Sequence, residues 1–102
     1  MCLYGVYDNY TVTFTNLLPY SIDVIWINGD QKEVVYAPNL ANGTEYSHLT
    51  YFTHNWIFKE SGTSNRLFAE ANGVKEATFE GCHFGAPINS IFHVAIVGTG
   101  KF

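Results

Sequence analysis

The sequence has few charged side chains, and basic ones are the scarcest. Only 14% of its 102 residues are Asp, Glu, Lys or Arg, just five are Lys or Arg, and the formal net charge at pH 7 is −4. Nucleic acids and anionic membrane surfaces are bound largely through clustered Lys and Arg side chains. We therefore expect neither nucleic acid nor membrane among the partners of this chain.

Long apolar runs and a secretory leader are also missing. No apolar stretch approaches the ~20 residues of a membrane-spanning helix. The first ten residues, MCLYGVYDNY, contain no basic segment followed by an apolar one, so they do not resemble a signal peptide. The sequence therefore predicts a cytoplasmic or nuclear protein.

Cysteine is scarce, with only Cys2 and Cys82 in the chain. These two residues allow one disulfide. A chain of this length that is 47% apolar can nevertheless fold without such a bond. Free thiols are therefore the favoured interpretation, and the residues alone leave the bridged alternative open.

The polar residues form no recognised catalytic or metal-binding motif. The carboxylates are scattered, and neither a GxSxG nor an HExxH pattern is present. Cys82 and His83 are adjacent, and His48 and His54 are six positions apart, but neither spacing is typical of a zinc site. We expect no enzyme activity, no cofactor and no bound metal; a hydrolase or metal site of unrecognised type is the alternative.

Aromatic residues, in contrast, are abundant at 17% of the chain, with seven Tyr, eight Phe and two Trp. Each buried ring contributes a large apolar area. This number of rings supplies a large core and leaves some over for a binding surface.

Short β-rich runs, separated by turn signals about every ten residues, dominate the chain. The run over residues 11–16 alternates, with Val12 and Phe14 on one face. The run over 21–28 alternates too, with Ile22, Val24 and Trp26 on one face. Further strands are expected over residues 33–37, where Pro38 ends the strand, and over 44–50, 55–61, 66–71, 75–81 and 89–97.

Turn chemistry supports the same architecture. The pair Asn72-Gly73 favours a tight hairpin turn, and residues 51–54 are expected to turn between two strands. Seven or eight short strands in one domain over residues 1–102 predict an all-β fold, an antiparallel β-sandwich.

Three segments carry side chains suited to a small, partly polar ligand. Trp26 and Tyr36 end two of the expected strands, and Thr50, His54 and Trp56 surround the turn over 51–54. Loops and strand ends are where such folds place binding sites. Trp and Tyr supply apolar walls, while Thr and His can donate or accept a hydrogen bond. The alternative is that both tryptophans are core residues, and the pattern alone favours it.

An ordered set of short segments runs through residues 12–63: VTFTN, VIWIN, LANGT and LTYFTHNWIFKESGT. Their order and spacing resemble the β-domain of the von Hippel–Lindau tumour suppressor family. RLFAEA, KEATF and GAPI resemble the remaining strands more loosely. The resemblance implies a non-catalytic β-sandwich that binds 4-hydroxyproline within a short peptide segment.

The resemblance also implies roles for individual residues. Trp26, Tyr36 and Trp56 would line an aromatic pocket, with the Tyr36 hydroxyl bonding the peptide backbone. Thr50 and His54 would hydrogen-bond the hydroxyl of the ligand. Two further residues would lie beside the site: Tyr51, and Leu49, which stands where the family has a histidine and would keep only a main-chain contact.

The implied partner is a hydroxyproline-containing peptide or protein. The α-domain of the family, which recruits elongin C, has no match in this chain, so elongin C is not an expected partner. The main alternative is a generic β-sandwich interaction or scaffold module without hydroxyproline specificity.

Overall fold

The computed structural model describes residues 4, 5 and 7–98 of the chain. They form nine strands and one short helix. The elements are β1 (Asn9–Asn16), β2 (Ile22–Ile27), β3 (Glu33–Leu40), β4 (Glu45–Tyr51), β5 (Asn55–Glu60), β6 (Phe68–Ala71), β7 (Val74–Glu76), β8 (Thr78–Glu80), α1 (Gly81–Phe84) and β9 (Ile91–Val97).

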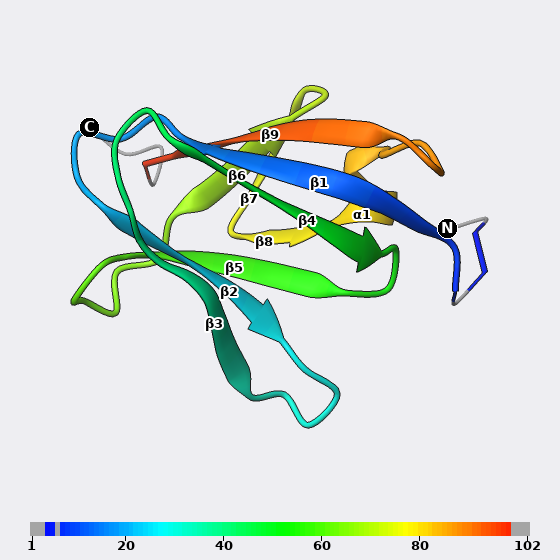
Figure 1. Cartoon of the computed structure of the whole chain (residues 1–102), viewed down its shortest axis with the longest axis horizontal. Coiled ribbons are helices and arrows are strands. Elements are labelled where there is room, and N and C mark those ends of the chain that lie inside the picture. The colour runs from blue at the N-terminus through cyan, green and yellow to red at the C-terminus, as the bar shows by residue number, and fades with distance from the viewer. Residues whose placement is uncertain (1–3, 6, 99–102) are drawn as a thin grey trace.

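The strands form two sheets that pack face to face, as Figure 1 shows. One sheet has the order β4-β1-β9-β6-β7, and the other has the order β3-β2-β5-β8. The predicted all-β sandwich is thus confirmed. One strand pair departs from the antiparallel expectation, because β1 runs parallel to β9.

The edge strand β3 is longer than predicted. The strand was expected to end at Pro38, yet it continues to Leu40. Proline lacks an N–H for the strand ladder and is tolerated mainly on sheet edges. The outer position of β3 in its sheet, and a register shift between Val24 and Ile25 where β2 pairs with β3, accommodate it.

The single strand predicted over residues 75–81 is in fact two strands in different sheets. β7 pairs with β6 in the five-stranded sheet, and β8 pairs with β5 in the four-stranded sheet. The chain then enters α1, whose first turn is capped by the Glu80 carboxylate accepting from the His83 N–H. Gly85, with φ of 76°, ends this helix. Four residues are too few to show a helical period in the sequence.

The turn predicted at Asn72-Gly73 is confirmed between β6 and β7. Both residues have positive φ values, 56° and 78°. This conformation is the one that a two-residue hairpin of type I′ requires, and Asn and Gly adopt it with the least strain.

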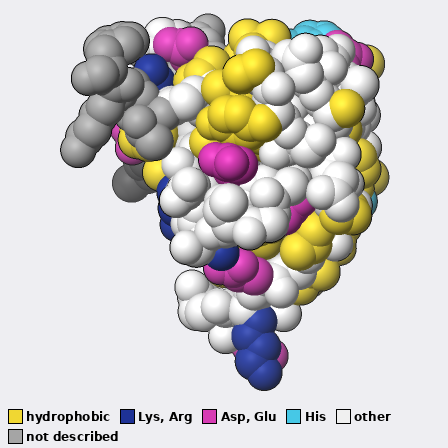
Figure 2. Space-filling view, turned by 90° about the vertical axis from the view of Figure 1, so that its left-hand side faces the viewer, with side chains coloured by type: hydrophobic (Ala, Val, Ile, Leu, Met, Phe, Trp, Pro, Cys, Tyr) yellow, Lys and Arg dark blue, Asp and Glu magenta, His cyan; other side chains and the backbone are white. Residues whose placement is uncertain are grey.

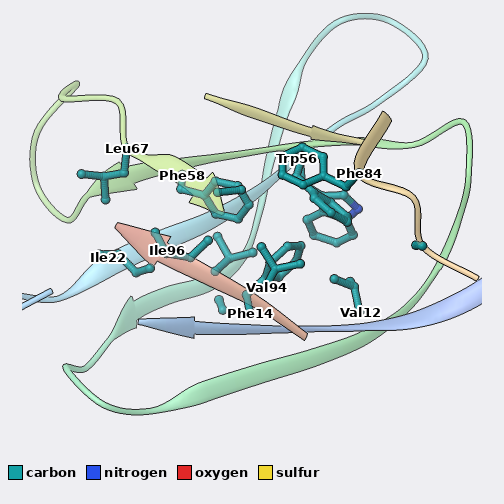
Figure 3. Packing of buried hydrophobic residues seen from close by; sticks show 14 of the residues in the cluster. Val12, Phe14, Ile22, Trp56, Phe58, Leu67, Phe84, Val94 and Ile96 are labelled. Atoms are coloured by element: carbon teal, nitrogen blue, oxygen red, sulfur yellow. The ribbon is translucent and has the colours of Figure 1, made fainter. Parts of the chain in front are cut away.

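The core lies between the two sheets, and aromatic rings dominate its centre (Figure 3). Phe14 contacts Phe58, Phe79 and Trp56 at ring-centroid distances of 4.9, 5.5 and 5.5 Å. The predicted alternation in β1 is confirmed, because Val12 and Phe14 have no exposed surface. This packing holds the two sheets together and so fixes the positions of their edge strands.

Two further expectations can be compared with the described residues. Cys82 is disulfide-bonded, so the interpretation as a free thiol is wrong there; the other cysteine of the chain, Cys2, lies outside the described residues.

Within the part of the chain that the structure describes, no helix has the length and apolar character needed to cross a membrane. On the face shown in Figure 2, acidic and basic side chains are scattered and form no extended patch of one sign.

Candidate functional site

The candidate site lies along the side of the sandwich where β3 and β4 are the edge strands of the two sheets. These strands follow each other in the chain, through residues 41–44. Side chains from both strands meet there: the rings of Tyr36 on β3 and His48 on β4 are 4.8 Å apart, edge to face. This side of the sandwich is closed by aromatic side chains rather than by another strand.

Residues of β4 alternate between two environments. Tyr46, His48 and Thr50 point toward the other sheet, while the intervening residues face outward and are exposed. Leu49 is 61% exposed and pairs across the outer face with Thr11 of β1. The structure therefore does not bring the Leu49 side chain to the other predicted site residues.

The backbone of Leu49 has a different position from its side chain. The Asn16 N–H donates to the Thr44 carbonyl oxygen at 3.0 Å, which marks that pair as hydrogen-bonded across β1 and β4. Hydrogen-bonded pairs alternate along an antiparallel ladder. The N–H and C=O groups of Leu49 consequently point along the free edge of β4, where they are available to a partner backbone.

The other predicted site residues form one connected group of rings. Trp26 lies 5.0 Å from His54 and 5.9 Å from Tyr36. Tyr36 lies 5.5 Å from Trp56, and His54 lies 5.2 Å from Tyr51. Side chains from β2, β3, β4 and β5 and from the turn before β5 are thus brought together, whereas the Leu49 side chain is not.

Thr50 and Trp56 form the floor of this group. The Trp56 Nε1–H donates to the Thr50 Oγ1 at 3.1 Å, and both residues are only 1% exposed. Because Oγ1 accepts this bond, the hydroxyl proton of Thr50 remains available for donation. A ligand can reach that proton only if a neighbouring side chain moves aside.

Trp26 and Trp56 have different environments. Trp56 is a core residue, as the alternative interpretation of the sequence predicts for both tryptophans. Trp26 is instead partly buried and packs against the core. The Nε1–H of Trp26 is buried and has no hydrogen-bond partner among the described residues. Buried N–H groups are rarely left unpaired, but because this one is buried, an acceptor from a ligand can reach it only if a neighbouring side chain moves.

A surface hollow of about 260 Å³ opens beside Trp26 and His54. The rest of its lining comes from the β2–β3 connection and from the turn before β5: Ile27, Asn28, Gly29, Gln31, Thr53 and Asn55. Amide and hydroxyl groups therefore surround the exposed edges of the two rings. The hollow is slightly below the ~300 Å³ at which drug-sized sites begin, and Tyr36, Thr50 and Trp56 do not line it.

His48 and Tyr46 were not among the predicted site residues, yet they extend the group of rings along β4. The Tyr46 hydroxyl and the His48 Nδ1 are 3.0 Å apart, and the His48 ring is 5.5 Å from that of Trp56. The signal that locates them is the period of two in a strand, because His48 and Tyr46 precede Thr50 by two and four positions.

Burial makes both histidines of the site poor bases. Desolvation lowers the pKa of His48 below its ordinary value of 6.5. Desolvation also lowers the pKa of His54, and the positive charge that His48 would carry lowers it further. Both imidazoles are therefore neutral at pH 7, and each offers one donor and one acceptor nitrogen.

Metal coordination has no support in the described residues. Across residues 4, 5 and 7–98, no group of three or more His, Cys, Asp or Glu side chains could hold a metal ion.

The comparison with protein families identifies the class of this fold and site. The pattern of the VHL beta domain family matches residues 6–76, more than half of the 102-residue chain. The chain therefore belongs to the VHL beta domain family. Members of this family recognise protein partners, so the chain is a protein-interaction module. A comparison with curated proteins found no match.

Proposed function

We propose that this protein is a non-catalytic reader of 4-hydroxyproline in protein segments. The observation that carries the proposal is the Trp56–Thr50 hydrogen bond beneath Tyr36, with His54 packed against Trp26. Movement of a neighbouring side chain would place one fixed hydroxyl and one neutral imidazole beside three aromatic walls. A five-membered ring with a single hydroxyl matches that combination.

Two kinds of contact would contribute to binding: aromatic packing and hydrogen bonds. The aromatic walls stabilise proline and hydroxyproline rings alike. Thr50 and His54 supply the preference, because each would lose a hydrogen-bond partner if a buried ligand carried no hydroxyl. A buried polar group left unpaired costs about 1–3 kcal/mol, which corresponds to a preference of about 5- to 150-fold in affinity.

The peptide backbone would run along the free edge of β4. There the N–H and C=O groups of Leu49 can pair with one residue of the peptide, without requiring the whole segment to form a β-strand. The exposed outer face of Leu49 is compatible with this mode, because only its main chain takes part. Tyr36 is 37% exposed, and its hydroxyl would donate to a peptide carbonyl.

A generic interaction module without hydroxyproline specificity is the second candidate. Its support is the burial of Thr50 and Trp56, each 1% exposed, since a permanently closed floor cannot meet a ligand hydroxyl. The two candidates differ in whether Tyr36 or His54 moves when the ligand enters. Rotamer changes of this size are common at interfaces.

Titration calorimetry with two matched peptides tests the proposal. One carries 4-hydroxyproline at its centre, and its twin carries proline at the same position. The proposal predicts that the hydroxylated peptide binds at least about fivefold more tightly. Equal affinity for the two peptides favours the generic module, and so does binding of neither.

A matched pair of His54 variants assigns the preference. His54→Ala removes the imidazole, and we expect it to abolish most of the difference between the two peptides. His54→Gln keeps a donor and an acceptor on a side chain of similar reach, and we expect it to retain part of the difference. An unchanged preference in His54→Ala would remove His54 from the proposed site.

A further inference from the structure

The rings of the candidate site continue in both directions along the β3–β4 side. Successive centroids are 4.8 to 5.9 Å apart, and the six residues, here called the aromatic stripe, are Tyr46, His48, Tyr36, Trp26, His54 and Tyr51. A site for one hydroxyproline ring needs only the part around Trp26, Tyr36 and His54. The Tyr46–His48 end is therefore unused by the proposed function.

Neighbouring rings of the stripe cross at steep angles around Tyr36. Tyr36 meets Trp26 at 73° and His48 at 86°, so its ring stands across theirs. All members of the stripe are exposed or partly buried. Grooves between crossed aromatic rings are the surfaces on which proline-rich segments dock in the polyproline II conformation.

The stripe is also free of charge. The only charged residues of β3 and β4, Glu33 and Glu45, bond elsewhere: Lys59 Nζ donates to Glu33 at 2.9 Å, and Thr15 Oγ1 donates to Glu45 at 3.5 Å. Both histidines are neutral at pH 7, because burial lowers their pKa values. A neutral segment with apolar rings complements this surface better than an acidic or basic one.

The spacing along β4 sets the distance between two bound rings. His48 and Tyr46 precede Thr50 by two and four positions, which is about 6.6 and about 13 Å along a strand. In polyproline II, residues three apart lie on the same side and are about 9.3 Å apart. That distance falls between His48 and Tyr46, where the two rings stack at 5.9 Å.

We propose that the Tyr46–His48 pair is a second subsite, which takes a proline ring three residues away from the hydroxyproline in a polyproline II segment. The inference rests on the proposed function, because the hydroxyproline fixes the register of the segment. It narrows the partner class to proteins with prolyl residues at intervals of three. Proline also lowers the entropy lost on binding, since its φ is already fixed.

A series of synthetic peptides tests the second subsite, with affinities measured by calorimetry. Each peptide carries one hydroxyproline and, in addition, a proline at one, two or three positions on either side, or none. We expect a gain of about threefold to tenfold from proline at one of the two positions three residues away. We expect no comparable gain from the positions one or two away.

Variants identify the surface that gives the gain. In Tyr46→Ala, the ratio of affinities for the two-ring and one-ring peptides should fall to about one, whereas Tyr46→Phe keeps the ring and should keep the ratio. Ile91→Ala changes a 66% exposed side chain on β9, which lies in the same five-stranded sheet as β4 but outside the stripe, and should not change the ratio. Circular dichroism on each variant verifies that the fold is intact.

The outcomes separate the two proposals. Hydroxyproline preference without any gain from a second proline overturns the second subsite and leaves the proposed function standing. Equal affinity of the native protein for the hydroxyproline peptide and its proline twin overturns the proposed function. A gain that survives Tyr46→Ala, or tighter binding of an uncharged oligosaccharide such as cellohexaose than of every proline peptide, also contradicts the second subsite.

Discussion

Two aromatic regions of this small protein differ in what surrounds their rings. In the core, Phe14, Phe58 and Phe79 have no exposed surface and contact other apolar side chains. Along the β3–β4 side, the rings carry hydroxyl, indole and imidazole groups and are partly open to solvent. The same residue class thus fills the core in one region and, under the proposed function, forms a recognition surface in the other.

Trp56 connects the two regions. Its ring contacts Phe14 in the core and Tyr36 in the stripe, each at 5.5 Å, and its Nε1–H holds the Thr50 hydroxyl. A change confined to either region should therefore affect one property, whereas a change at this junction should affect both.

The largest expected effect is on stability, from Phe58→Ala in the core. Removal of a fully buried phenyl group leaves a cavity and costs about 3–5 kcal/mol of unfolding free energy. Urea denaturation measures this loss. The fraction that remains folded should bind peptide with native affinity, because Phe58 does not belong to the stripe. A parallel loss of affinity would contradict the separation of the two regions.

A smaller effect on both properties is expected from Thr50→Val. Valine keeps the shape but leaves the buried Trp56 N–H without its acceptor, which costs about 1–3 kcal/mol of stability. The preference for hydroxyproline over proline should fall at the same time. Thr50→Ser keeps the hydroxyl and is the matched control; it should retain the preference. If Thr50→Val binds the two peptides as the native protein does, Thr50 has no part in recognition.

Tyr10 provides a test of how a buried, unpaired hydroxyl in the core affects stability. Its hydroxyl is buried without a hydrogen-bond partner among the described residues, and burial, with a smaller effect of Glu80, raises its pKa above the ordinary value of 10.0. Tyr10→Phe should therefore leave the unfolding free energy unchanged or raise it by up to about 1–3 kcal/mol.

The sign of the alkaline effect at Tyr10 follows from linkage. Above pH 10 the unfolded chain loses the Tyr10 proton while the folded chain keeps it, so the native protein becomes less stable as pH rises. The difference between Tyr10→Phe and the native protein should thus grow in alkaline solution. Denaturation curves at pH 8 and at about pH 10.5 measure it, and a difference that shrinks would refute the burial of this hydroxyl.

The smallest expected effect is the acid response of the stripe. Burial lowers the pKa values of His48 and His54 below 6.5, so the unfolded chain binds protons first as pH falls. The stability contributed by the neutral imidazoles is fully present above pH 6.5, the ordinary pKa of histidine in the unfolded chain. It decreases as the pH falls from there through the lower pKa values of the folded protein. His48→Gln should make the loss between about pH 7 and about pH 5 shallower. A native protein that gains stability over this interval would contradict the assignment.

Much of this architecture could be predicted from the sequence because it depends on local rules. The period of two in β1 and the Asn72-Gly73 turn determine the strand faces and one hairpin. The alternation in β4 places Tyr46, His48 and Thr50 on one face, and it also requires Leu49 to point away from them.

Other features depend on tertiary contacts that no short pattern records. The split of residues 75–81 between two sheets depends on β5 and β6 each taking one half as a partner. The continuation of β3 through Pro38 depends on its position at a sheet edge. The burial of Thr50 depends on rings from other strands, so the sequence indicates its hydroxyl but not that it lies beneath a closed surface.

The central claim is that the Thr50 and His54 hydroxyl contacts make this module a hydroxyproline reader. The most direct measurement is the affinity of the native protein at about pH 7.5 for a hydroxyproline peptide and for its proline twin. The account predicts that the hydroxylated peptide binds at least about fivefold more tightly. Equal affinities would contradict it and leave a VHL beta domain module that recognises its partner without reading the hydroxyl group.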